Sequence, residues 1–482
     1  IMTLETDLAE ILPAQSLLLS EEARRPYECD GLSAYQQLPR VVVLPETRAQ
    51  VEAVVKTCAA HAVPVIARGA GTGLSGGALP LAEACLLSLA KFSRIVSIDP
   101  DNCTAVVEPG VRNAAISAAA APHGLYYAPD PSSQIACSIG GNVAENSGGV
   151  HSLKYGLTVN NVLAVEILTA EGEWLRLGEG ALDNPGYDLL AVVNGSEGLL
   201  GVIMQITVRL LPLPPTARVL LGAFATVGDA ADAVAGVIAA GIIPAGLEMM
   251  DHLAIAVAED FCHAGYPRDA AAILLCELDG TTREVDAKIE SVTEIFYRHQ
   301  ATEVRASQNE AERQRFWIGR KSAFPAMGRV APDYYCIDGT IPRRHLGDVL
   351  ARIAELSAEY GLPVANVFHA GDGNLHPLIA YDANDDGQLE AAEKIGAKIL
   401  ETCVEVGGTV TGEHGVGVEK LDQMCVQFAG GELGLFHALK AAFDPTGLLN
   451  PGKAVPTLHR CAELGAMHVH AGRLRFPDLE RF

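Results

Sequence analysis

Two short segments in the last quarter of the chain carry side chains that could hold a metal ion. The first runs from His369 to His376 around a Gly-Asp-Gly turn, and the second places Glu413 beside His414 between glycines. Imidazole and carboxylate groups suit a borderline divalent cation such as Zn²⁺ with one coordination position open. Asp372, inside the first segment, is either a further ligand or a turn residue. The residues predict a metal site but leave open which of them bind.

Three glycine-rich segments in the first half of the chain, 68–77, 139–149 and 195–203, could cradle a phosphate-containing cofactor. Successive glycine amides can point at one anion, and the polar side chains between them add donors. The run Gly71 to Gly76 matches the G-x-G-x-x-G pattern of dinucleotide-binding folds. A strand-like run begins by Cys85, however, which leaves no room for the helix that should hold a pyrophosphate. We therefore expect a long, folded cofactor rather than a nicotinamide in a Rossmann fold.

The composition limits the classes of partner. The chain has 482 residues, 49% hydrophobic and 20% charged, which is enough for two or three well-packed domains. Its net charge of -24 disfavours binding to nucleic acid or anionic lipid. No apolar run is long enough to cross a membrane and the N-terminus lacks a signal-peptide layout, so we expect a cytoplasmic chain. Eleven cysteines without a C-x-x-C pair predict reduced core thiols and no iron–sulfur cluster.

Hydrophobic periodicity predicts the elements that carry these segments. A helix should follow the capping pair Thr47 and Gln50, and a second should run from Pro342 to Gly361. The strands that we expect are 41–44, 63–67, 85–89, 94–98, 104–107, 205–210 and 364–369, the last leading into His369.

The proline-rich segment 211–215 is the best candidate for a domain boundary, because proline cannot donate to a sheet and stiffens a linker. We expect a first domain over 1–213 with a helical lead-in over 1–40. A second domain over 214–425 should carry the metal site, and a C-terminal helical segment over 426–482 should dock on the first domain.

The combined motifs resemble a known family. The glycine-rich segments, with Pro129-Asp130-Pro131 and Lys154-Tyr155-Gly156, are similar to the FAD-binding (PCMH-type) domain of vanillyl-alcohol-oxidase-type flavoproteins. Together with the metal segments and Asn450-Pro451-Gly452-Lys453, they resemble the FAD-linked D-2-hydroxy-acid dehydrogenases and oxidases, above all the glycolate oxidase type. The likeness runs from about Val41 to Lys453.

The resemblance implies an α+β fold. A two-part FAD-binding domain should be followed by a substrate (cap) domain with an antiparallel sheet, and the C-terminal segment should return to the FAD domain. The first loop has no histidine to tether a flavin, so we expect noncovalent FAD. The expected cofactor-binding residues are Arg68, Gly69, Ala70, Gly71, Thr72, Gly73, Ser75, Gly76, Pro129, Asp130, Ser133, Gly140, Gly141, Asn142, Ala144, Asn146, Gly149, Tyr155, Gly156, Glu197, Gly198, Gly201, Val202, Ile203 and Asn450.

The resemblance also divides the chemistry among the metal-site residues. It assigns His369, His376 and Glu413 to a divalent metal, with zinc favoured and manganese or iron as alternatives, and His414 to acid–base catalysis. The metal would act as a Lewis acid on the substrate hydroxyl while hydride passes to flavin N5. Arg320 is the expected partner of the substrate carboxylate, because a guanidinium grips a carboxylate through two bonds.

Two departures from the family pattern bear on the substrate. Some relatives carry a lysine in the strand that here reads Tyr335-Cys336-Ile337-Asp338, and some have a polar residue where this chain has Leu378. Both differences favour a small monocarboxylate, glycolate first and D-lactate next, over D-2-hydroxyglutarate.

Two other classes of function are open to the sequence. The metal residues alone would suit a flavin-free metallohydrolase, which leaves the glycine-rich segments unexplained. A non-catalytic subunit of a redox complex would not need the metal residues or His414. The glycolate oxidase likeness further implies partner subunits, one carrying iron–sulfur clusters, and peripheral association with the inner face of the cell membrane through them.

Overall fold

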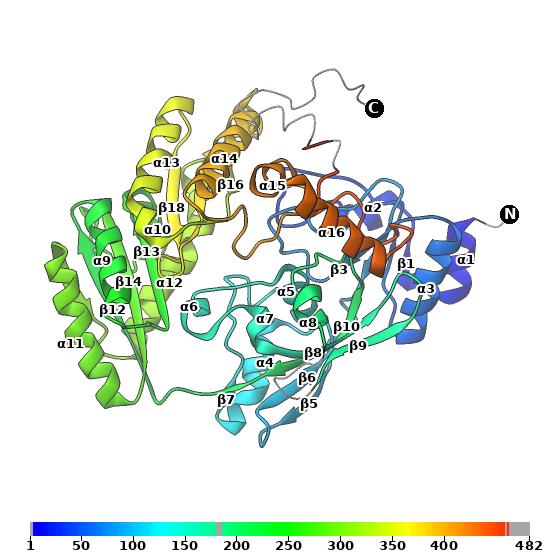
Figure 1. Cartoon of the computed structure of the whole chain (residues 1–482), viewed down its shortest axis with the longest axis horizontal. Coiled ribbons are helices and arrows are strands. Elements are labelled where there is room, and N and C mark those ends of the chain that lie inside the picture. The colour runs from blue at the N-terminus through cyan, green and yellow to red at the C-terminus, as the bar shows by residue number, and fades with distance from the viewer. Residues whose placement is uncertain (1–2, 180–185, 458–459, 462–482) are drawn as a thin grey trace. The chain divides into compact units, whose positions relative to one another are not determined.

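The computed structural model describes residues 3–179, 186–457 and 460–461. The chain forms two compact units, which Figure 1 shows with their elements labelled. The first comprises Ile1–Ser147, Leu157–Pro212 and His414–Phe482, and the second comprises Gly148–Gly156 and Leu213–Glu413. The second unit starts at Leu213, within the proline-rich segment, and also includes a short excursion at Gly148–Gly156. The chain returns to the first unit at His414. The expected domains 1–213, 214–425 and 426–482 stay predictions.

A four-stranded sheet opens the first unit, in the order β1-β2-β4-β3. β4 runs parallel to both β2 and β3, and β1 pairs antiparallel with β2. The lead-in is partly helical, but it also supplies β1. The elements are α1 (Leu4–Ile11), β1 (Leu17–Leu18), α2 (Glu21–Arg24), β2 (Val41–Val43), α3 (Arg48–Ala60), β3 (Val65–Arg68) and β4 (Cys85–Ser88).

Helix α3 forms for the reasons that its sequence suggests. Thr47 accepts from the backbone of Gln50, and the Gln50 side chain accepts from the backbone of Thr47, so the predicted capping box is present. Its apolar stripe is buried against the sheet core. The stretch between β3 and β4, all of it described, contains no helix. The objection to a Rossmann fold is therefore confirmed.

A five-stranded antiparallel sheet completes the first unit, in the order β5-β6-β10-β8-β9. Its inward apolar side chains form a second core with those of α4 and α5. Two short strands, β7 (Leu125–Tyr126) and β11 (Leu211–Pro212), pair beside it. The other elements are β5 (Ile95–Asp99), β6 (Thr104–Val107), α4 (Asn113–Ala120), α5 (Ile139–Glu145), α7 (Thr158–Asn161), β8 (Val162–Leu168), β9 (Trp174–Gly178), α8 (Leu189–Val193) and β10 (Val202–Arg209).

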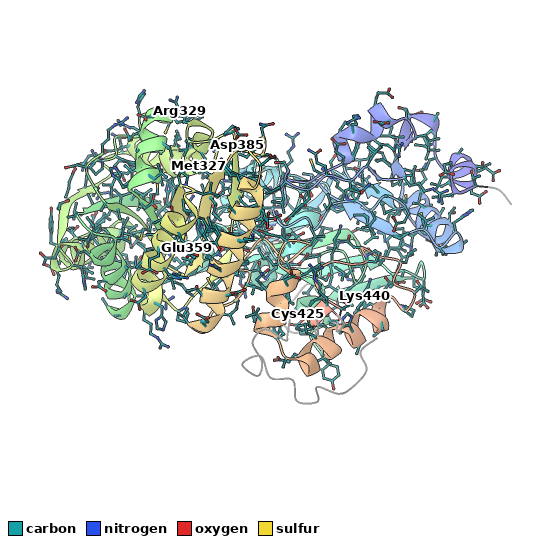
Figure 2. All side chains as sticks on the ribbon, turned by 90° about the horizontal axis from the view of Figure 1, so that it is seen from above. Met327, Arg329, Glu359, Asp385, Cys425 and Lys440 are labelled. Carbon is teal, nitrogen blue, oxygen red and sulfur yellow. A yellow bond between two sulfur atoms is a disulfide. The ribbon has the colours of Figure 1, made fainter. Side chains whose placement is uncertain are left out.

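The C-terminal part of the first unit contains α15 (Leu421–Gln427) and α16 (Gly430–Phe443). Lys440 on α16, labelled in Figure 2, donates to the carbonyls of Leu199 and Leu449, each at 2.7 Å. Beyond α16 the chain runs beside β3, where Val65 N donates to Leu448 O and Asn450 N to Val65 O, both at 2.9 Å. These bonds hold the C-terminal segment on the same unit as the glycine-rich loops.

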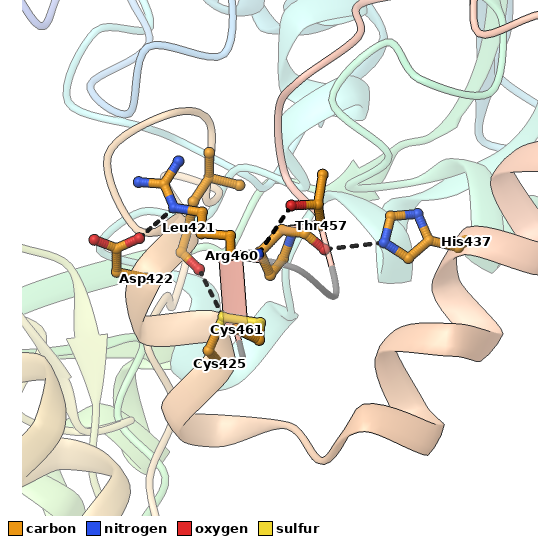
Figure 3. The surroundings of a disulfide bond; sticks show 8 residues. Leu421, Asp422, Cys425, His437, Thr457, Arg460 and Cys461 are labelled. Carbon is orange, nitrogen blue, oxygen red and sulfur yellow. Dashed lines mark hydrogen bonds and ion pairs between the residues drawn. A yellow bond between two sulfur atoms is a disulfide. The ribbon is translucent and has the colours of Figure 1, made fainter. Parts of the chain in front are cut away.

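A disulfide between Cys425 and Cys461 corrects the expectation that all cysteines are reduced. The two residues are 36 apart in sequence, with Cα atoms 5.3 Å apart, and the other nine cysteines are free. Figure 3 shows the bond between α15 and the chain after α16, where Arg460 also pairs with Asp422. Sequence spacing gave no sign of this pairing, because the chain between the two cysteines must first fold back on itself.

The second unit is built on a seven-stranded sheet, in the order β15-β12-β14-β13-β18-β20-β16, in which every neighbouring pair is antiparallel. This confirms the predicted α+β class with an antiparallel sheet. Helices α9 and α11 pack against β12 and β14, and α14 packs against β16 and β20. The helices are α9 (Val227–Ala239), α10 (His252–Cys262), α11 (Thr282–Arg298), α12 (Glu310–Ala326), α13 (Leu346–Tyr360) and α14 (Gln388–Glu405). The strands are β12 (Thr216–Phe224), β13 (Gly246–Asp251), β14 (Ala272–Gly280), β15 (Ala301–Ala306), β16 (Asp333–Cys336), β17 (Gly339–Thr340), β18 (Val364–Phe368), β19 (Asn374–Leu375) and β20 (Pro377–Tyr381).

The excursion 148–156, which contains α6 (Ser152–Tyr155), binds two buried acids of β14. His151 Nε2 lies 2.9 Å from Glu277, and both Lys154 and Tyr155 contact the Asp279 carboxylate. We refer to residues 148–156 as the clasp segment, because its side chains neutralise acids that the sheet itself leaves buried.

No helix among the described residues is long and apolar enough to cross a membrane.

Candidate active site

His369 and His376 are brought together by a tight turn between two strands of the second unit. β18 ends one residue before His369, whose N–H bonds Asn374 O at 3.1 Å, while Gly373 N bonds His369 O at 3.0 Å. Gly373 has φ +84, and a Cβ there would lie 2.1 Å from Ile341 O, so the turn requires glycine. Asp372 accepts from Asn374 N at 3.2 Å, which is the turn role.

The two imidazoles and Glu413 form a compact ligand set. Nε2 of His369 and Nε2 of His376 each lie 3.2 Å from Glu413 Oε1, and one ligand atom from each residue falls within 4.8 Å of the others. Ligands about 2.0–2.1 Å from a tetrahedral zinc ion are about 3.3 Å from one another. The spacing and the donor chemistry therefore fit a divalent metal held by these three residues.

The electrostatics of the set match ligands that share a positive centre. Burial lowers the pKa of His369, but the carboxylates of Glu248 and Glu413 outweigh it and raise that pKa well above its ordinary value. Burial raises the pKa of Glu413, yet the two histidines hold it well below the usual range. The buried carboxylates thus favour positive charge at the two imidazoles, the sign of charge that a divalent cation also carries.

A buried acid outside both motifs organises the Glu413 segment. Asp338, fully buried, accepts from Thr411 Oγ1 at 2.6 Å, from Gly412 N at 3.0 Å and from Glu413 N at 3.2 Å. It also accepts from Asn374 Nδ2 at 2.7 Å. One carboxylate therefore holds both metal segments in place through hydrogen bonds.

A second buried acid, Glu248 on β13, contacts His369 from the other side. Its Oε1 lies 2.7 Å from His369 Nδ1, and its Oε2 takes Nε and Nη2 of Arg320 at 2.9 and 2.8 Å. Arg320 is 1% exposed. Its expected contact with a substrate carboxylate stays a prediction, and the guanidinium bonds that the structure shows go to Glu248.

His414 follows Glu413 in the chain and is the first residue of the last stretch of the first unit. Within that unit, Ser75 Oγ donates to His414 O at 3.0 Å. Glu197 accepts from Val416 N and Gly417 N, each at 2.7 Å. The backbone on which His414 sits is thus fastened to two of the glycine-rich loops.

The three glycine-rich loops and the C-terminal segment converge in the first unit. A Cβ on Gly69 would lie 2.2 Å from Ser138 Oγ, at the start of α5, so the first two loops approach closely. The third joins them where Glu197 N bonds Ala144 O at 2.8 Å. Asn450 Nδ2 then donates to Gly77 O at 3.0 Å and to Glu197 O at 2.6 Å. The predicted return of Asn450 to the loops is what the structure shows.

Polar atoms at this convergence fit a bound polar cofactor. Among the described residues, no hydrogen-bond partner reaches the buried Asn450 Oδ1 or Glu145 Oε2. Burial and the neighbouring Glu197 raise the pKa of Glu145 well above its ordinary value. At Gly73 a Cβ would meet no atom nearer than 3.9 Å, which leaves room against that loop. These features suit FAD, whose ring and ribityl groups both donate and accept.

The other expected cofactor residues divide into three groups. Three of them accept hydrogen bonds from within the protein. Asn113 Nδ2 donates to Asn142 Oδ1 and to Pro129 O, and Val159 N donates to Asn146 Oδ1. Arg68 donates to Cys29 O at 2.6 Å. Gly149, Tyr155 and Gly156 belong to the clasp segment of the second unit. The first unit contains the rest of the set, namely Ala70, Gly71, Thr72, Gly76, Asp130, Ser133, Gly140, Gly141, Gly198, Gly201, Val202 and Ile203.

Sequence reasoning did not find Glu248, and it noted Asp338 without a role. Glu248 stands between leucine and methionine in β13, and Asp338 follows the apolar residues Cys336 and Ile337. An acid among buried apolar residues is the signal that was available, since it needs a charged or hydrogen-bonding partner in the fold.

Comparison with known proteins agrees with the fold and with the flavin loops. Residues 39–178 match the family model described as an FAD binding domain, and residues 213–454 match the C-terminal domain of FAD linked oxidases. The chain is 63% identical to the glycolate oxidase subunit GlcD of Escherichia coli (strain K12) over 98% of its own length and 95% of the relative. It is 38% identical to GlcD of Bacillus subtilis (strain 168), over 90% of its own length and 93% of the relative. It is 33% identical to a D-lactate dehydrogenase of Archaeoglobus fulgidus, over 87% and 92%.

Solved structures share the fold at low sequence identity. p-Cresol methylhydroxylase with substrate bound superposes with a TM-score of 0.78 at 19% identity, covering 94% of this chain and 96% of the other. The 4-ethylphenol oxidase of Gulosibacter chungangensis superposes with a TM-score of 0.77 at 17% identity, covering 94% of this chain and 97% of the other. The chain therefore belongs to the FAD-linked oxidase family, with an FAD-binding domain over residues 39–178.

Proposed function

We propose that this protein oxidises a small D-2-hydroxy acid to the 2-oxo acid, with glycolate favoured and D-lactate next. The observation that carries the proposal is the 63% identity to a glycolate oxidase subunit across nearly the whole chain. D-lactate dehydrogenases are more distant relatives, at 30 and 33%. Both matched family models describe FAD-linked proteins, which speaks against a flavin-free metallohydrolase.

Noncovalent FAD would lie against the converged loops of the first unit and would supply the hydride acceptor, its N5. A divalent metal held by His369, His376 and Glu413, zinc in the first place, would act as a Lewis acid toward the substrate hydroxyl. The 3.2 Å spacing of the ligand atoms supports that assignment. Manganese and iron accept the same nitrogen and oxygen donors and are the alternatives.

His414 is the proposed acceptor of the hydroxyl proton. An imidazole has an ordinary pKa of about 6.5, so it can take up a proton near neutral pH. Its backbone is fastened by Ser75, and the following residues by Glu197, which favours a fixed orientation over a mobile one.

The surroundings of the metal ligands favour a substrate with a single carboxylate. Asp338 follows β16, the strand in which some relatives carry a lysine, and its oxygens are already engaged by backbone and side-chain donors. Leu378 is fully buried, paired in register with Cys336 and Ala365. A second carboxylate, as in D-2-hydroxyglutarate, would find no cation in these two places. Arg320 remains our candidate for the first carboxylate.

The wider setting is also part of the proposal. Partner subunits of a glycolate oxidase complex, one with iron–sulfur clusters, would take the electrons onward, because no C-x-x-C pair or cluster motif exists in this chain. The protein would be cytoplasmic and would reach the inner face of the membrane through those partners.

Anaerobic titration of the FAD-loaded protein with a panel of D- and L-2-hydroxy acids tests the reaction. We expect flavin absorbance to bleach with glycolate, then with D-lactate, and to stay unchanged with D-2-hydroxyglutarate. Removing the metal with a chelator should abolish bleaching while FAD stays bound. Bleaching at full rate in metal-free protein would refute the Lewis-acid role, and a colourless protein that turns over would refute the flavin.

Replacing His414 separates catalysis from binding. In His414→Asn we expect the rate of flavin reduction by glycolate to fall about 10²- to 10⁴-fold, the usual contribution of a general base. Stopped-flow absorbance measures this rate, and the glycolate dependence should change little. His123→Asn, at an exposed histidine of the first unit, is the matched control and should reduce at the wild-type rate.

A further inference from the structure

Glu248 is a buried acid with two different partners, one on each oxygen. We propose that Glu248, with its charge balanced by Arg320, positions His369 as a metal ligand. The inference deepens the proposed function, because it rests on the metal site within it. Glu248 and Arg320 are each 1% exposed, so neither contact is shared with bulk water.

Strand pairing places the backbone of Glu248 beside that of His369. β13 pairs antiparallel with β18 through Met249↔Phe368 and Met250↔Val367. Continuing this register by one residue sets Glu248 opposite His369. The bond from Gly371 N to Leu247 O, at 2.9 Å, ties the turn after His369 to the same strand.

The contact selects one form of the imidazole. A carboxylate oxygen accepts, so Glu248 Oε1 at 2.7 Å requires a proton on His369 Nδ1. The lone pair of the neutral ring is then on Nε2, the atom that lies 3.2 Å from Glu413 Oε1. Carboxylates that hold metal-binding histidines in this manner fix the tautomer and the ring orientation and raise the basicity of the ligand nitrogen.

Arg320 makes the buried carboxylate tolerable. Nε and Nη2 both contact Oε2, which leaves Oε1 to His369. An unbalanced charge buried at such a site is strongly unfavourable, because desolvation is not repaid by a partner. Arg320 comes from α12, whose neighbouring Gly319 touches Tyr266 and Ala264 so closely that a Cβ would lie 2.4 Å from Tyr266 Oη. The helix is thus packed tightly enough to hold the guanidinium in place.

Metal affinity tests the inference directly. Wild type, Glu248→Gln, Glu248→Asp and Arg320→Lys are loaded with FAD, and Zn²⁺ and Mn²⁺ dissociation constants are measured by chelator competition. We expect Glu248→Gln to bind both metals about 10- to 100-fold more weakly, with FAD per chain unchanged. Glu248→Asp, which keeps the charge but shortens the reach, should lose less.

Glu277→Gln is the matched control. Glu277 is also a buried acid of the same sheet that contacts a histidine and an arginine, His151 and Arg313, but neither is a metal ligand. Its replacement should leave both dissociation constants at the wild-type value. An equal loss in Glu277→Gln would overturn the inference, because it would show general loosening of the sheet.

Arg320 distinguishes positioning from substrate binding. If it balances Glu248, Arg320→Lys weakens metal binding, and the KM for glycolate returns toward wild type when metal is saturating. A raised KM with unchanged metal affinity would overturn its positioning role and assign it to the substrate carboxylate.

The inference and the proposed reaction can fail separately. Wild-type metal affinity in both Glu248→Gln and Glu248→Asp overturns the inference even if glycolate bleaches the wild-type flavin. If Glu248→Gln does not fold, the metal affinity of Glu248→Asp alone decides. If Glu248→Gln weakens metal binding but no 2-hydroxy acid reduces the flavin of the wild-type protein, the inference is supported and the proposed reaction is refuted.

Discussion

At the level of single residues, two acids outside the His369–His376 and Glu413–His414 segments hold the proposed metal ligands together. Glu248 contacts the side chain of His369, whereas Asp338 contacts both the side chain of His376 and the backbone that carries Glu413. Sequence could predict a cluster of candidate ligands, because histidines and a glutamate stand at close spacing among glycines, and the structure brings His369, His376 and Glu413 together. Their supports could not, because Glu248 lies 121 residues from His369 and gains its meaning only when β13 and β18 pair.

Replacing Asp338 should disturb the site through its backbone. In Asp338→Asn one carboxylate oxygen becomes an amide nitrogen that cannot accept, so donors such as Gly412 N and Glu413 N, which are part-buried, lose a partner. The loss of a partner by a buried donor costs about 1–3 kcal/mol, which is the upper bound here. We expect a lower free energy of unfolding and weaker Zn²⁺ binding, measured by denaturant titration and chelator competition. Asp382→Asn, at an acid in an exposed turn after β20, is the control and should change neither quantity.

At the level of elements, the clasp segment shows what β14 needs in order to be buried. Glu277 and Asp279 are nearly inaccessible, and their partners come from the clasp segment and from α12. Although burial raises it, the His151 and Arg313 contacts and the Trp317 hydrogen bond hold the pKa of Glu277 at about 2. The strand is therefore stabilised by a carboxylate that stays ionised.

The stability from Glu277 should depend on pH in a defined direction. Its pKa is lower in the folded state, at about 2 against an ordinary 4.5, so its contribution is complete above pH 4.5 and is lost as pH falls toward 2. The difference corresponds to about 3 kcal/mol. We expect Glu277→Gln to lower the free energy of unfolding by about that amount at pH 7, with the gap from wild type narrowing below pH 4.5. Urea titrations at several pH values measure it, and a gap independent of pH would contradict the assignment.

Much of the element pattern could be predicted, and the exceptions have physical causes. The helix from Thr47 and the strand 104–107 appear as expected, because capping and alternation are local properties. The strand expected at 205–210 begins at Val202, since its first residues pair with the end of β8. The place of the clasp segment in the second unit could not be predicted, because the β14 partners of His151 and Tyr155 are more than a hundred residues away in sequence. The expected contact of Gly149, Tyr155 and Gly156 with FAD stays a prediction.

At the scale of the molecule, the Cys425–Cys461 disulfide closes the chain around α16 and the segment that returns to β3. Cross-linking residues 36 apart lowers the entropy of the unfolded chain by an amount worth up to about 4 kcal/mol. The segment that it closes includes Asn450, which bonds two glycine-rich loops.

Breaking this bond should therefore loosen the cofactor loops before it affects the metal. In Cys461→Ser, or in wild type with reductant, we expect a lower midpoint for the thermal transition of the first unit and faster FAD release. Calorimetry and flavin fluorescence follow the two effects. Cys103→Ser removes a free thiol of the same unit and should behave as wild type in the absence of reductant. An unchanged midpoint in Cys461→Ser would show that the disulfide does not stabilise the unit.

The clasp segment has a practical consequence for anyone who divides this protein into parts. A fragment cut at the family boundary, residue 213, would express the whole seven-stranded sheet but leave behind His151, Lys154 and Tyr155. Glu277 and Asp279 would then be buried in the fragment without the partners His151 and Lys154. A fragment that folds by itself would need the clasp segment attached to it. The stretch from residue 213 onward is continuous in sequence, but its buried acids are not all paired without these nine residues from earlier in the chain.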